Sequence, residues 1–304
     1  MKILCTVGQE KFQFNSFINK VNQLNILFPQ HQFIVQYGNC TLLPTADIKQ
    51  FSVLSQDEFS LLLDSVDCVI SHCGEGNFLL LQEKQIPYIL VPRKYDLKEH
   101  IDNHQLELAE FLQSKNIPIA YTLDHLESFL NNPSFIPFHT NLDDVSNILT
   151  VKYKEVFSIM NICSTGGHYH GIKLLNSFYQ DKDVVWVTFP NSTTKLELNH
   201  QKVQWAYFPT NRNIFNLIRN LFLAPFTITK YKPQLILSTG AGISVPFLWI
   251  GKLFGCNTVF VESITRVNEL SLSARILMKV KAIDTLVVRS PKLKLKYPSS
   301  LLAS

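Results

Sequence analysis

Short apolar runs alternate with longer segments of helical period along the whole chain. Such runs, bounded by Gly, Pro or polar residues, are typical of buried strands, whereas apolar residues three and four positions apart indicate one face of a helix. In the first half the pattern predicts strands at 2–7, 32–36, 67–71, 88–91 and 118–120, and helices at 15–27, 57–65, 77–83 and 101–114. In the second half it predicts strands at 157–162, 184–188, 203–207, 234–237, 257–261 and 285–288, and helices at 167–178, 213–231, 242–254 and 270–281.

The regular alternation of strand and helix indicates a parallel sheet with crossover helices in each half. A polar segment at 131–141 separates the two halves, and a predicted helix at 143–153 follows it, so we place the domain boundary near residue 152. The sequence therefore predicts an α/β protein of two Rossmann-like domains, residues 1–152 and 153–304. In such folds ligands bind at the carboxyl ends of the strands, here in the cleft where the two domains face each other.

Composition limits the class of protein. With 46% hydrophobic and 17% charged residues the chain is globular. Its six cysteines are scattered without a C-x-x-C spacing, which favours a reducing compartment and neither a disulfide framework nor a zinc site. Residues 1–8 do not form a signal peptide, and no stretch reaches the ~18 consecutive apolar residues that span a bilayer. We expect a protein that does not cross a membrane.

The charge is distributed unevenly. Residues 1–152 hold 10 Lys/Arg against 17 Asp/Glu, a net charge of −7, whereas residues 153–304 hold 18 against 7, a net charge of +11. A basic half indicates nucleic acid, an anionic lipid or an anionic substrate as partner, and a merely solvated basic face is the alternative. Nucleic acid is disfavoured because no basic stretch is interleaved with aromatic residues and no nucleic-acid-binding motif is present.

Three predicted strand-to-helix junctions, 70–77, 163–168 and 238–244, are rich in Gly and small polar residues. Glycine lets the backbone approach a ligand, and the helix that follows offers N–H groups and the positive end of its dipole, so each junction suits a diphosphate. A tight turn has the same composition. No junction continues into G-K-[ST] or completes G-x-G-x-x-G, so the chain has neither a P-loop nor a dinucleotide fingerprint.

A polar cluster at 99–105 contains two His, two acidic residues and two amides. Amides and carboxylates match the hydroxyls of a nucleotide and a sugar, so donor binding is the favoured interpretation. A metal site is one alternative, but His100 and His104 alone make a poor one. A solvated helix start is the other alternative. Further along, Glu262 and Arg266 follow a predicted strand and would form an i,i+4 ion pair if their segment were helical.

These motifs resemble a known family. The first half is similar to the catalytic, donor-binding subunit of the two-subunit enzyme that adds the second GlcNAc to dolichol-pyrophosphate-GlcNAc, and the second half is similar to its acceptor and membrane-recruiting subunit. Bacterial relatives extend exopolysaccharide or capsule repeats, and all resemble the family 28 glycosyltransferase that makes lipid II. The matching stretches are 7–8 with Phe12, 71–76 and 99–109 in the first half, and 164–168, 210–213, 238–247, 261–263 and 266–267 in the second.

The resemblance implies a GT-B fold, with the donor domain first, in the reverse of the usual single-chain order. It implies an inverting transfer from a UDP-sugar to a polyprenyl-pyrophosphate-linked saccharide, in which helix N-termini rather than a metal or other cofactor steady the departing UDP. The D-x-D of Asp181 and Asp183 precedes a predicted strand, at the wrong end of the sheet for such a metal site. A UDP-sugar 2-epimerase and a non-catalytic UDP-sugar-binding recruiter are the alternatives.

We expect His168 to be the catalytic base, because a helix N-terminus favours the neutral imidazole that can take a proton. A phosphate donor and a structural helix cap are its alternative roles, and Glu262 is the alternative base. Leu80 stands where many relatives have a Glu that holds the ribose, so Glu99 or Gln105 is the candidate for that contact. The resemblance implies a donor set of Gly8, Ser71, His72, Gly74, Gly76, Asn77, Arg93, Glu99, Asn103, His104 and Gln105. It implies an acceptor set of Thr165, Gly166, Gly167, Asn211, Arg212, Thr239, Gly240, Ala241, Gly242 and Arg266.

The basic second half would then hold both an anionic lipid substrate and an anionic leaflet. The segment 211–232 could lie in the membrane interface, because its apolar residues stand among basic ones. The apolar residues are Phe215, Leu217, Ile218, Leu221, Phe222 and Leu223, and the basic ones are Arg212, Arg219, Lys230 and Lys232. An ordinary amphipathic core helix is the alternative. We therefore expect a peripheral protein on the cytoplasmic face of the membrane.

Overall fold

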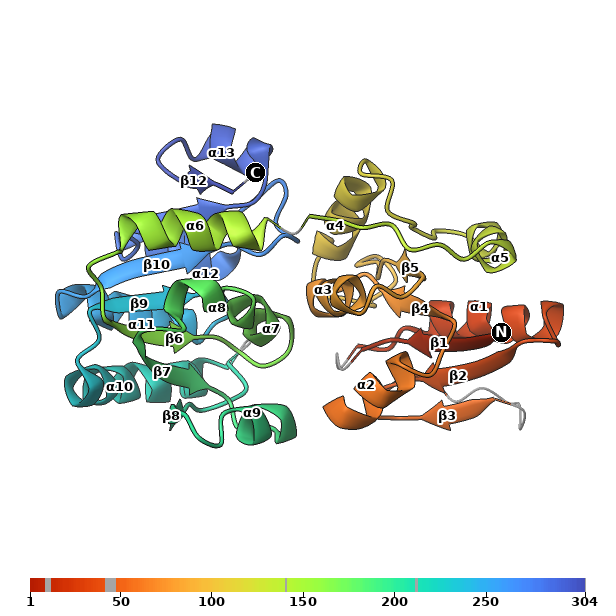
Figure 1. Cartoon of the computed structure of the whole chain (residues 1–304), viewed down its shortest axis with the longest axis horizontal. Helices are drawn as coiled ribbons and strands as arrows, with labels where there is room; N and C mark the ends of the chain where they lie inside the picture. The colour runs from red at the N-terminus through yellow and green to blue at the C-terminus, as the bar shows by residue number, and fades with distance from the viewer. Residues whose placement is uncertain (9–11, 42–47, 140, 211–212, 304) are drawn as a thin grey trace. The chain divides into compact units, whose positions relative to one another are not determined.

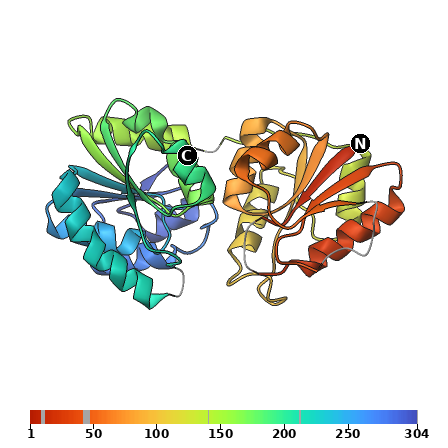
Figure 2. The same cartoon turned by 90° about the horizontal axis from the view of Figure 1, so that it is seen from below.

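A computed structural model describes residues 1–8, 12–41, 48–139, 141–210 and 213–303. The chain divides into two compact units, Met1–His139 and Thr140–Ser304. Each unit is a parallel sheet with helices on both faces (Figures 1 and 2). This confirms the predicted α/β class with two Rossmann-like domains.

The first unit has five parallel strands in the order β3-β2-β1-β4-β5. The strands are β1 Lys2–Thr6, β2 Gln32–Gln36, β3 Lys49–Phe51, β4 Cys68–His72 and β5 Tyr88–Val91. The helices are α1 Asn15–Leu27, α2 Gln56–Leu63, α3 Glu75–Lys84, α4 His104–Gln113 and α5 Leu123–Asn131. Alternate strand residues such as Ile3 and Cys5 point to one face, where α1 and α5 cover them with Phe17, Val21 and Leu126.

The second unit has seven parallel strands in the order β12-β11-β10-β9-β6-β7-β8. The strands are β6 Ser158–Ile162, β7 Asp183–Thr188, β8 Lys202–Trp205, β9 Leu235–Ser238, β10 Asn257–Val261, β11 Thr285–Val288 and β12 Leu301–Leu302. The helices are α6 Leu142–Lys152, α7 Gly167–Lys173, α8 Asn176–Tyr179, α9 Ser192–Glu197, α10 Ile214–Tyr231, α11 Ser244–Leu253, α12 Leu272–Lys279 and α13 Pro291–Lys296.

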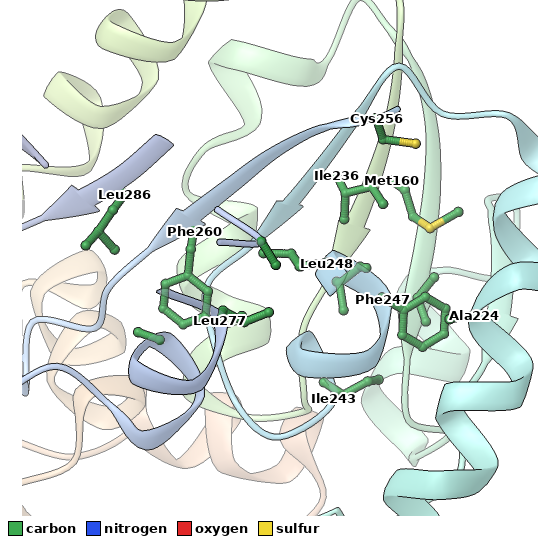
Figure 3. Packing of buried hydrophobic residues seen from close by; sticks show 14 of the residues in the cluster. Met160, Ala224, Ile236, Ile243, Phe247, Leu248, Cys256, Phe260, Leu277 and Leu286 are labelled. Carbon is green, nitrogen blue, oxygen red and sulfur yellow. The ribbon is translucent and has the colours of Figure 1, made fainter. Parts of the chain in front are cut away.

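One face of this second sheet carries a continuous apolar core. Met160, Ile236 and Phe260 from three neighbouring strands meet Phe247 of α11 and Leu277 of α12, all of them fully buried (Figure 3). Fully burying side chains of this size stabilises the fold by about 1.5–3 kcal/mol each. The core fixes where α11 begins, and therefore the loop between β9 and α11.

Both sheets have a topological switch point. In the first unit the chain leaves β1 toward β2 on one side, and β4 lies on the other side of β1. In the second unit β6 lies between β7 and β9. The chain adds β7 and β8 on one side of β6 and then β9 to β12 on the other side. The loops that follow β1, β4, β6 and β9 diverge at these points, where doubly wound folds bind ligands. All three Gly-rich junctions predicted from the sequence follow one of these strands.

The structure corrects several sequence expectations. Contacts divide the units between His139 and Thr140, earlier than the predicted boundary at residue 152, because α6 packs on α8 and belongs to the second unit. The predicted helix at 167–178 is two helices, α7 and α8. Residues 118–120 pair with β5 only through a bridge between Leu90 and Ile119.

Two further predictions concern the compartment and the membrane. All six cysteines are buried and free, which confirms that the chain has no disulfide framework. Among the described residues, no helix combines the length and the apolar character that crossing a bilayer requires.

Candidate active site

The imidazole of His72 lies between the two Gly loops of the first unit. A Cβ atom at Gly8 would lie 2.4 Å from His72 Cε1, and one at Gly74 would lie 2.6 Å from His72 Nε2. Only residues without a side chain fit at these two positions, and Gly8 also has a positive φ of 75°. Gly8 and Gly74, both members of the predicted donor set, thus pack closely against His72.

Burial, and secondarily the Arg93 guanidinium, lower the pKa of His72 to about 3. The imidazole is therefore neutral at physiological pH. The Asn77 amide donates to Ser71 Oγ at 3.0 Å and lies 3.4 Å from His72 Nδ1. Asn77 stands in the first turn of α3, after the half-buried Gly76, so these groups surround the positive end of that helix.

Gln36 holds the backbone of Gly8, a role that the sequence analysis missed. Its amide donates to Gly8 O at 3.0 Å, and its Oε1 accepts from Gly8 N at 3.1 Å and from Thr6 Oγ1 at 2.7 Å. Gln36 ends the buried strand β2 and is 3% exposed. A polar residue at the carboxyl end of an otherwise apolar strand was the signal in the sequence.

Arg93 has a supporting position rather than the exposed one expected of a donor contact. It is fully buried, and its guanidinium donates to Val7 O at 2.7 Å, Phe12 O at 2.9 Å and Glu99 O at 3.1 Å. The guanidinium also lies 4.7 Å from the centre of the Phe14 ring. Arg93 therefore ties the loop after β1 to the loop before α4.

The polar cluster at 99–105 is built around the same arginine. Gln105 Oε1 accepts from Arg93 N at 3.1 Å, and Glu99 accepts from Lys94 N at 3.1 Å and from the Ser16 hydroxyl. Glu99 and Gln105 are both almost fully buried. Their carboxylate and amide are therefore part of the internal bonding of this loop.

Asn103 and His104 stand where the loop enters α4. Asn103 Oδ1 accepts from Tyr95 N at 3.2 Å, and His104 Nδ1 is hydrogen-bonded to Asp102. Asp102 and His104 are partly exposed, unlike Glu99 and Gln105. Of the predicted donor set beyond β5, the residues that reach solvent are therefore those around the start of α4.

In the second unit, two Gly-rich loops are joined through His168. Thr239 O lies 2.8 Å from His168 Nδ1, and Thr239 Oγ1 donates to His168 O at 2.7 Å. A carbonyl oxygen only accepts, so Nδ1 carries the proton and the neutral ring has its lone pair on Nε2. His168 lies in the first turn of α7, as predicted.

The loop after β9 is shaped to receive this histidine. A Cβ at Gly240 would lie 2.9 Å from His168 Cε1, and Gly240 has a positive φ of 120°. Ala241 also has a positive φ, 72°, which is costly for a residue with a side chain. Ser238 and Ser244 hold the loop, with their hydroxyls 2.7 Å apart.

The remaining predicted acceptor residues are arranged around these loops. A Cβ at Gly242 would lie 3.2 Å from Thr210 Oγ1, so the segment before α10 approaches the same loop. Gly166 is exposed, with a positive φ of 76° and open space beside it, and Thr165 and Gly167 are half-buried. Asn211 and Arg212 lie outside the described residues.

Glu262 has a structural position. One oxygen accepts from Ser263 N at 3.0 Å and the other from Ser271 N at 2.8 Å, and the residue is 2% exposed. Burial raises its pKa, while these two backbone N–H groups favour the charged form. The segment from Glu262 to Arg266 is not helical, so the condition stated for a helical i,i+4 pair is not met, although the charge of Arg266 also favours the ionised form of Glu262. This arrangement favours His168 over Glu262 as the base.

Comparisons with known proteins divide the chain in the same way. The model of the glycosyltransferase family 28 C-terminal domain matches residues 2–132, and that of the Alg14-like oligosaccharide biosynthesis proteins matches residues 200–303. The human UDP-N-acetylglucosamine transferase subunit ALG14 is 36% identical over 184 residues, which cover 50% of this chain and 84% of that protein.

The ALG13 subunit of the same transferase from Candida albicans is 28% identical over 125 residues, which cover 39% of this chain and 41% of that protein. This chain thus spans less than half of that relative. A crystal structure of MurG from Acinetobacter baumannii has a TM-score of 0.35 and 16% identity over 44% of this chain and 41% of that one. The order of the two domain matches confirms the predicted one, and the chain belongs to the glycosyltransferase family of Alg14-like proteins, with a family 28 C-terminal domain ahead of its Alg14-like part.

Proposed function

We propose that this chain transfers GlcNAc from UDP-GlcNAc to a polyprenyl-pyrophosphate-linked saccharide, with inversion at the anomeric carbon. One observation carries the proposal. A single polypeptide contains similarity to both subunits of a transferase, and both of those relatives are named for UDP-N-acetylglucosamine transfer. Similarity to one subunit alone would not distinguish an enzyme from a recruiting protein.

The donor belongs on the first unit in this proposal. The amino end of α3 offers N–H groups and a positive dipole end to the diphosphate, beside Asn77. Asn103 and His104, at the start of α4, are the polar residues that we assign to the nucleotide sugar. Gln36, His72 and Arg93 act indirectly, because their polar groups hold the backbone of the surrounding loops.

The acceptor belongs on the second unit. The loops at 164–167 and 239–242 provide backbone N–H groups and little side-chain bulk, which suits a pyrophosphate. The basic character of residues 153–304 favours the same anionic ligand. Gly166 is exposed, and Thr165, Gly167, Ala241 and Gly242 are half-buried.

His168 is the proposed base. As the acceptor hydroxyl attacks the anomeric carbon, its proton passes to His168 Nε2, and the bond from that carbon to the diphosphate oxygen breaks so that UDP leaves with the electron pair. The Thr239 carbonyl favours this direction of transfer, because it stabilises the Nδ1–H of the imidazolium that forms. General-base catalysis of this kind contributes about 10²–10⁴-fold. No step in the proposed reaction uses a metal, so we expect transfer to continue in excess EDTA.

We also propose that the protein is peripheral on the cytoplasmic face of a membrane and that α10 contacts the lipid. The inward face of α10 is polar in its first half, ahead of Ala224 and Ile228, which join the apolar core. Asn220 accepts from Tyr207 N at 3.0 Å and donates to Tyr207 O at 2.9 Å, and Asn216 donates to Pro209 O at 3.1 Å. Both asparagines are buried.

The outward face of α10 is also apolar, unlike that of an ordinary surface helix. Phe215, Ile218, Phe222 and Phe226 are exposed there, with Phe226 81% exposed. Arg219 lies 3.7 Å from the centre of the Tyr207 ring beside this row. Aromatic residues flanked by basic ones suit the boundary between anionic headgroups and acyl chains.

The function is tested by incubating the purified chain with membranes and a panel of labelled UDP-sugars, with EDTA in a parallel set. We expect label from UDP-GlcNAc in the lipid fraction. Mild acid should release this label, as it does a saccharide that is linked to lipid through pyrophosphate. Conversion of the free UDP-GlcNAc to its 2-epimer would instead identify an epimerase. UDP-GlcNAc binding with neither transfer nor epimerisation would identify a recruiter.

A further inference from the structure

Two imidazoles and one carboxylate converge just before α4. His100 Nδ1 lies 3.3 Å from Asp102 Oδ1, and His104 Nδ1 is hydrogen-bonded to that same oxygen. The two rings are almost perpendicular, at 86°, with their centres 4.4 Å apart. One ring nitrogen of each histidine and one carboxylate oxygen of Asp102 all lie within 4.8 Å of one another. The carboxylate of Asp102 thus stands between the two histidines that alone would make a poor metal site.

The hydrogen bonds of the described residues do not account for His100. Its side chain is 6% exposed, and its Nδ1 has no hydrogen-bond partner. The contact of 3.3 Å to Asp102 lies within ion-pair distance but lacks the geometry of a hydrogen bond. A buried ring nitrogen that is not hydrogen-bonded costs free energy, and it points to a ligand that takes its lone pair.

We propose that His100, Asp102 and His104 bind one divalent transition-metal ion, with Zn²⁺ as the representative ligand. Imidazole nitrogen and carboxylate oxygen are the ligands that Zn²⁺ accepts, with bond lengths of about 2.0–2.2 Å. Ligands at the corners of a tetrahedron of that size stand about 3.3 Å apart. The separation between His100 Nδ1 and Asp102 Oδ1 already has this value.

Coordination requires only a local change. The neutral rings would carry their protons on Nε2, so that both Nδ1 lone pairs face the ion, and the bond between His104 and Asp102 would open to admit it. Asp102 is 36% exposed and His104 19%, so the ion has access from solvent and a fourth position remains for water. The carboxylate charge of Asp102 offsets the opposing dipole at the start of α4.

The site shares His104 with the proposed donor site, but metal binding can be measured without a transfer assay, so the two proposals can fail separately. The full chain is titrated with Co²⁺, whose tetrahedral complexes absorb visible light, and Zn²⁺ is then added. We expect one equivalent of Co²⁺ to produce the bands and Zn²⁺ to abolish them. Asp102→Asn keeps the size of the side chain but removes its charge, and it should weaken Co²⁺ binding by at least about tenfold. His104→Ala should weaken binding by at least as much.

His125→Ala is the matched control, because His125 lies in the same unit, is hydrogen-bonded to Tyr121 N and is remote from this cluster in the sequence. It should bind Co²⁺ as the wild type does. Far-UV circular dichroism of each variant checks that the chain is folded. Absence of the visible bands in the wild type, or equal binding by the wild type and the folded Asp102→Asn variant, would overturn the site.

Discussion

The carbonyl oxygen of Thr239 lies 2.8 Å from Nδ1 of His168, and the Thr239 hydroxyl donates back to the carbonyl of His168 at 2.7 Å. Thr239 lies in the loop after β9, and His168 lies in the first turn of α7, the helix that follows β6. This reciprocal pair fixes both the position and the tautomer of the histidine. The proposed transfer of a proton to His168 depends on this pair of hydrogen bonds.

Gly240→Ala tests whether the position of His168 matters. The added Cβ would lie 2.9 Å from His168 Cε1, and the backbone has a φ of 120° there, so the ring or the loop must move. A displacement of about 1 Å costs up to about 10²-fold in rate. We expect turnover to fall by about 10-fold to 100-fold while UDP affinity, which belongs to the other unit, is unchanged.

Gly171→Ala is the control for this substitution. Gly171 lies in α7, its φ is not positive, and nothing stands within 4 Å of an added Cβ. Turnover should be that of the wild type, and the free energy of unfolding should be equal or up to about 1 kcal/mol larger. If both variants keep full turnover, close packing of Gly240 on His168 is irrelevant to the reaction.

His72 should make the first unit sensitive to acid. Its pKa is about 3 in the folded chain, whereas an unperturbed histidine has a pKa of about 6.5. Below pH ~6.5 the unfolded chain binds a proton that the folded chain does not, so stability falls as the pH falls toward 3. The loss should be about 2 kcal/mol between pH 7 and pH 5.

Thiol labelling can measure this loss in one unit at a time. The chain is equilibrated in urea at each pH, and a short labelling pulse at a fixed pH then marks exposed cysteines. Cys5 and Cys68 report the first unit, and Cys163 and Cys256 report the second. The acid-induced shift at Cys5 and Cys68 should be smaller in His72→Gln; a shift of unchanged size would mean that other groups cause it.

The sequence predicted most of the architecture because periodicity is a local signal. Strand β10 was predicted with its observed bounds, and α10 to within one residue. Strand β3 was missed because it is short and half-exposed at the sheet edge. Helix α5 was missed although Leu123, Leu126 and Leu130 follow helical spacing, because it has only nine residues. The boundary was misplaced because α6 is joined to the second unit by packing, which sequence alone does not reveal.

The site was predictable only in part. The Gly loops were found because glycine before a helix is a local pattern. The roles of Arg93 and Glu262 could not be predicted from the sequence. Arg93 bonds a backbone group that lies far away along the chain, and Glu262 bonds one across a non-helical loop. Likewise, the partnership of Gln36 with Gly8 spans 28 positions and depends on the pairing of β1 with β2.

The membrane account predicts a defined loss of lipid binding. Phe222 and Phe226 are 75% and 81% exposed on α10, so replacing both by Ser should leave the core intact and abolish sedimentation with vesicles that contain phosphatidylglycerol. Leu295→Ser is the control, since Leu295 is equally exposed, at 81%, but lies on α13. Undiminished vesicle binding by the double variant would show that this face of α10 does not contact the lipid. If the wild type is a dimer and the double variant is a monomer, this face of α10 contacts a second copy of the chain instead.

The two units should be inactive apart and active together. We place the donor on Met1–His139 and the acceptor on Thr140–Ser304, so neither unit alone brings the reacting atoms together. Co-expressed or mixed units should regain transfer, and the first unit should bind UDP weakly by calorimetry. Transfer by an isolated unit would refute the division of substrates.

The most direct test of the central claim is His168→Ala, assayed for GlcNAc transfer at saturating donor and acceptor and for UDP affinity. If His168 Nε2 accepts the proton, turnover should fall by at least about a hundredfold. The dissociation constant for UDP should not change, because the histidine is on the other unit. Turnover close to that of the wild type, with the variant folded, would contradict the account and remove His168 from the mechanism.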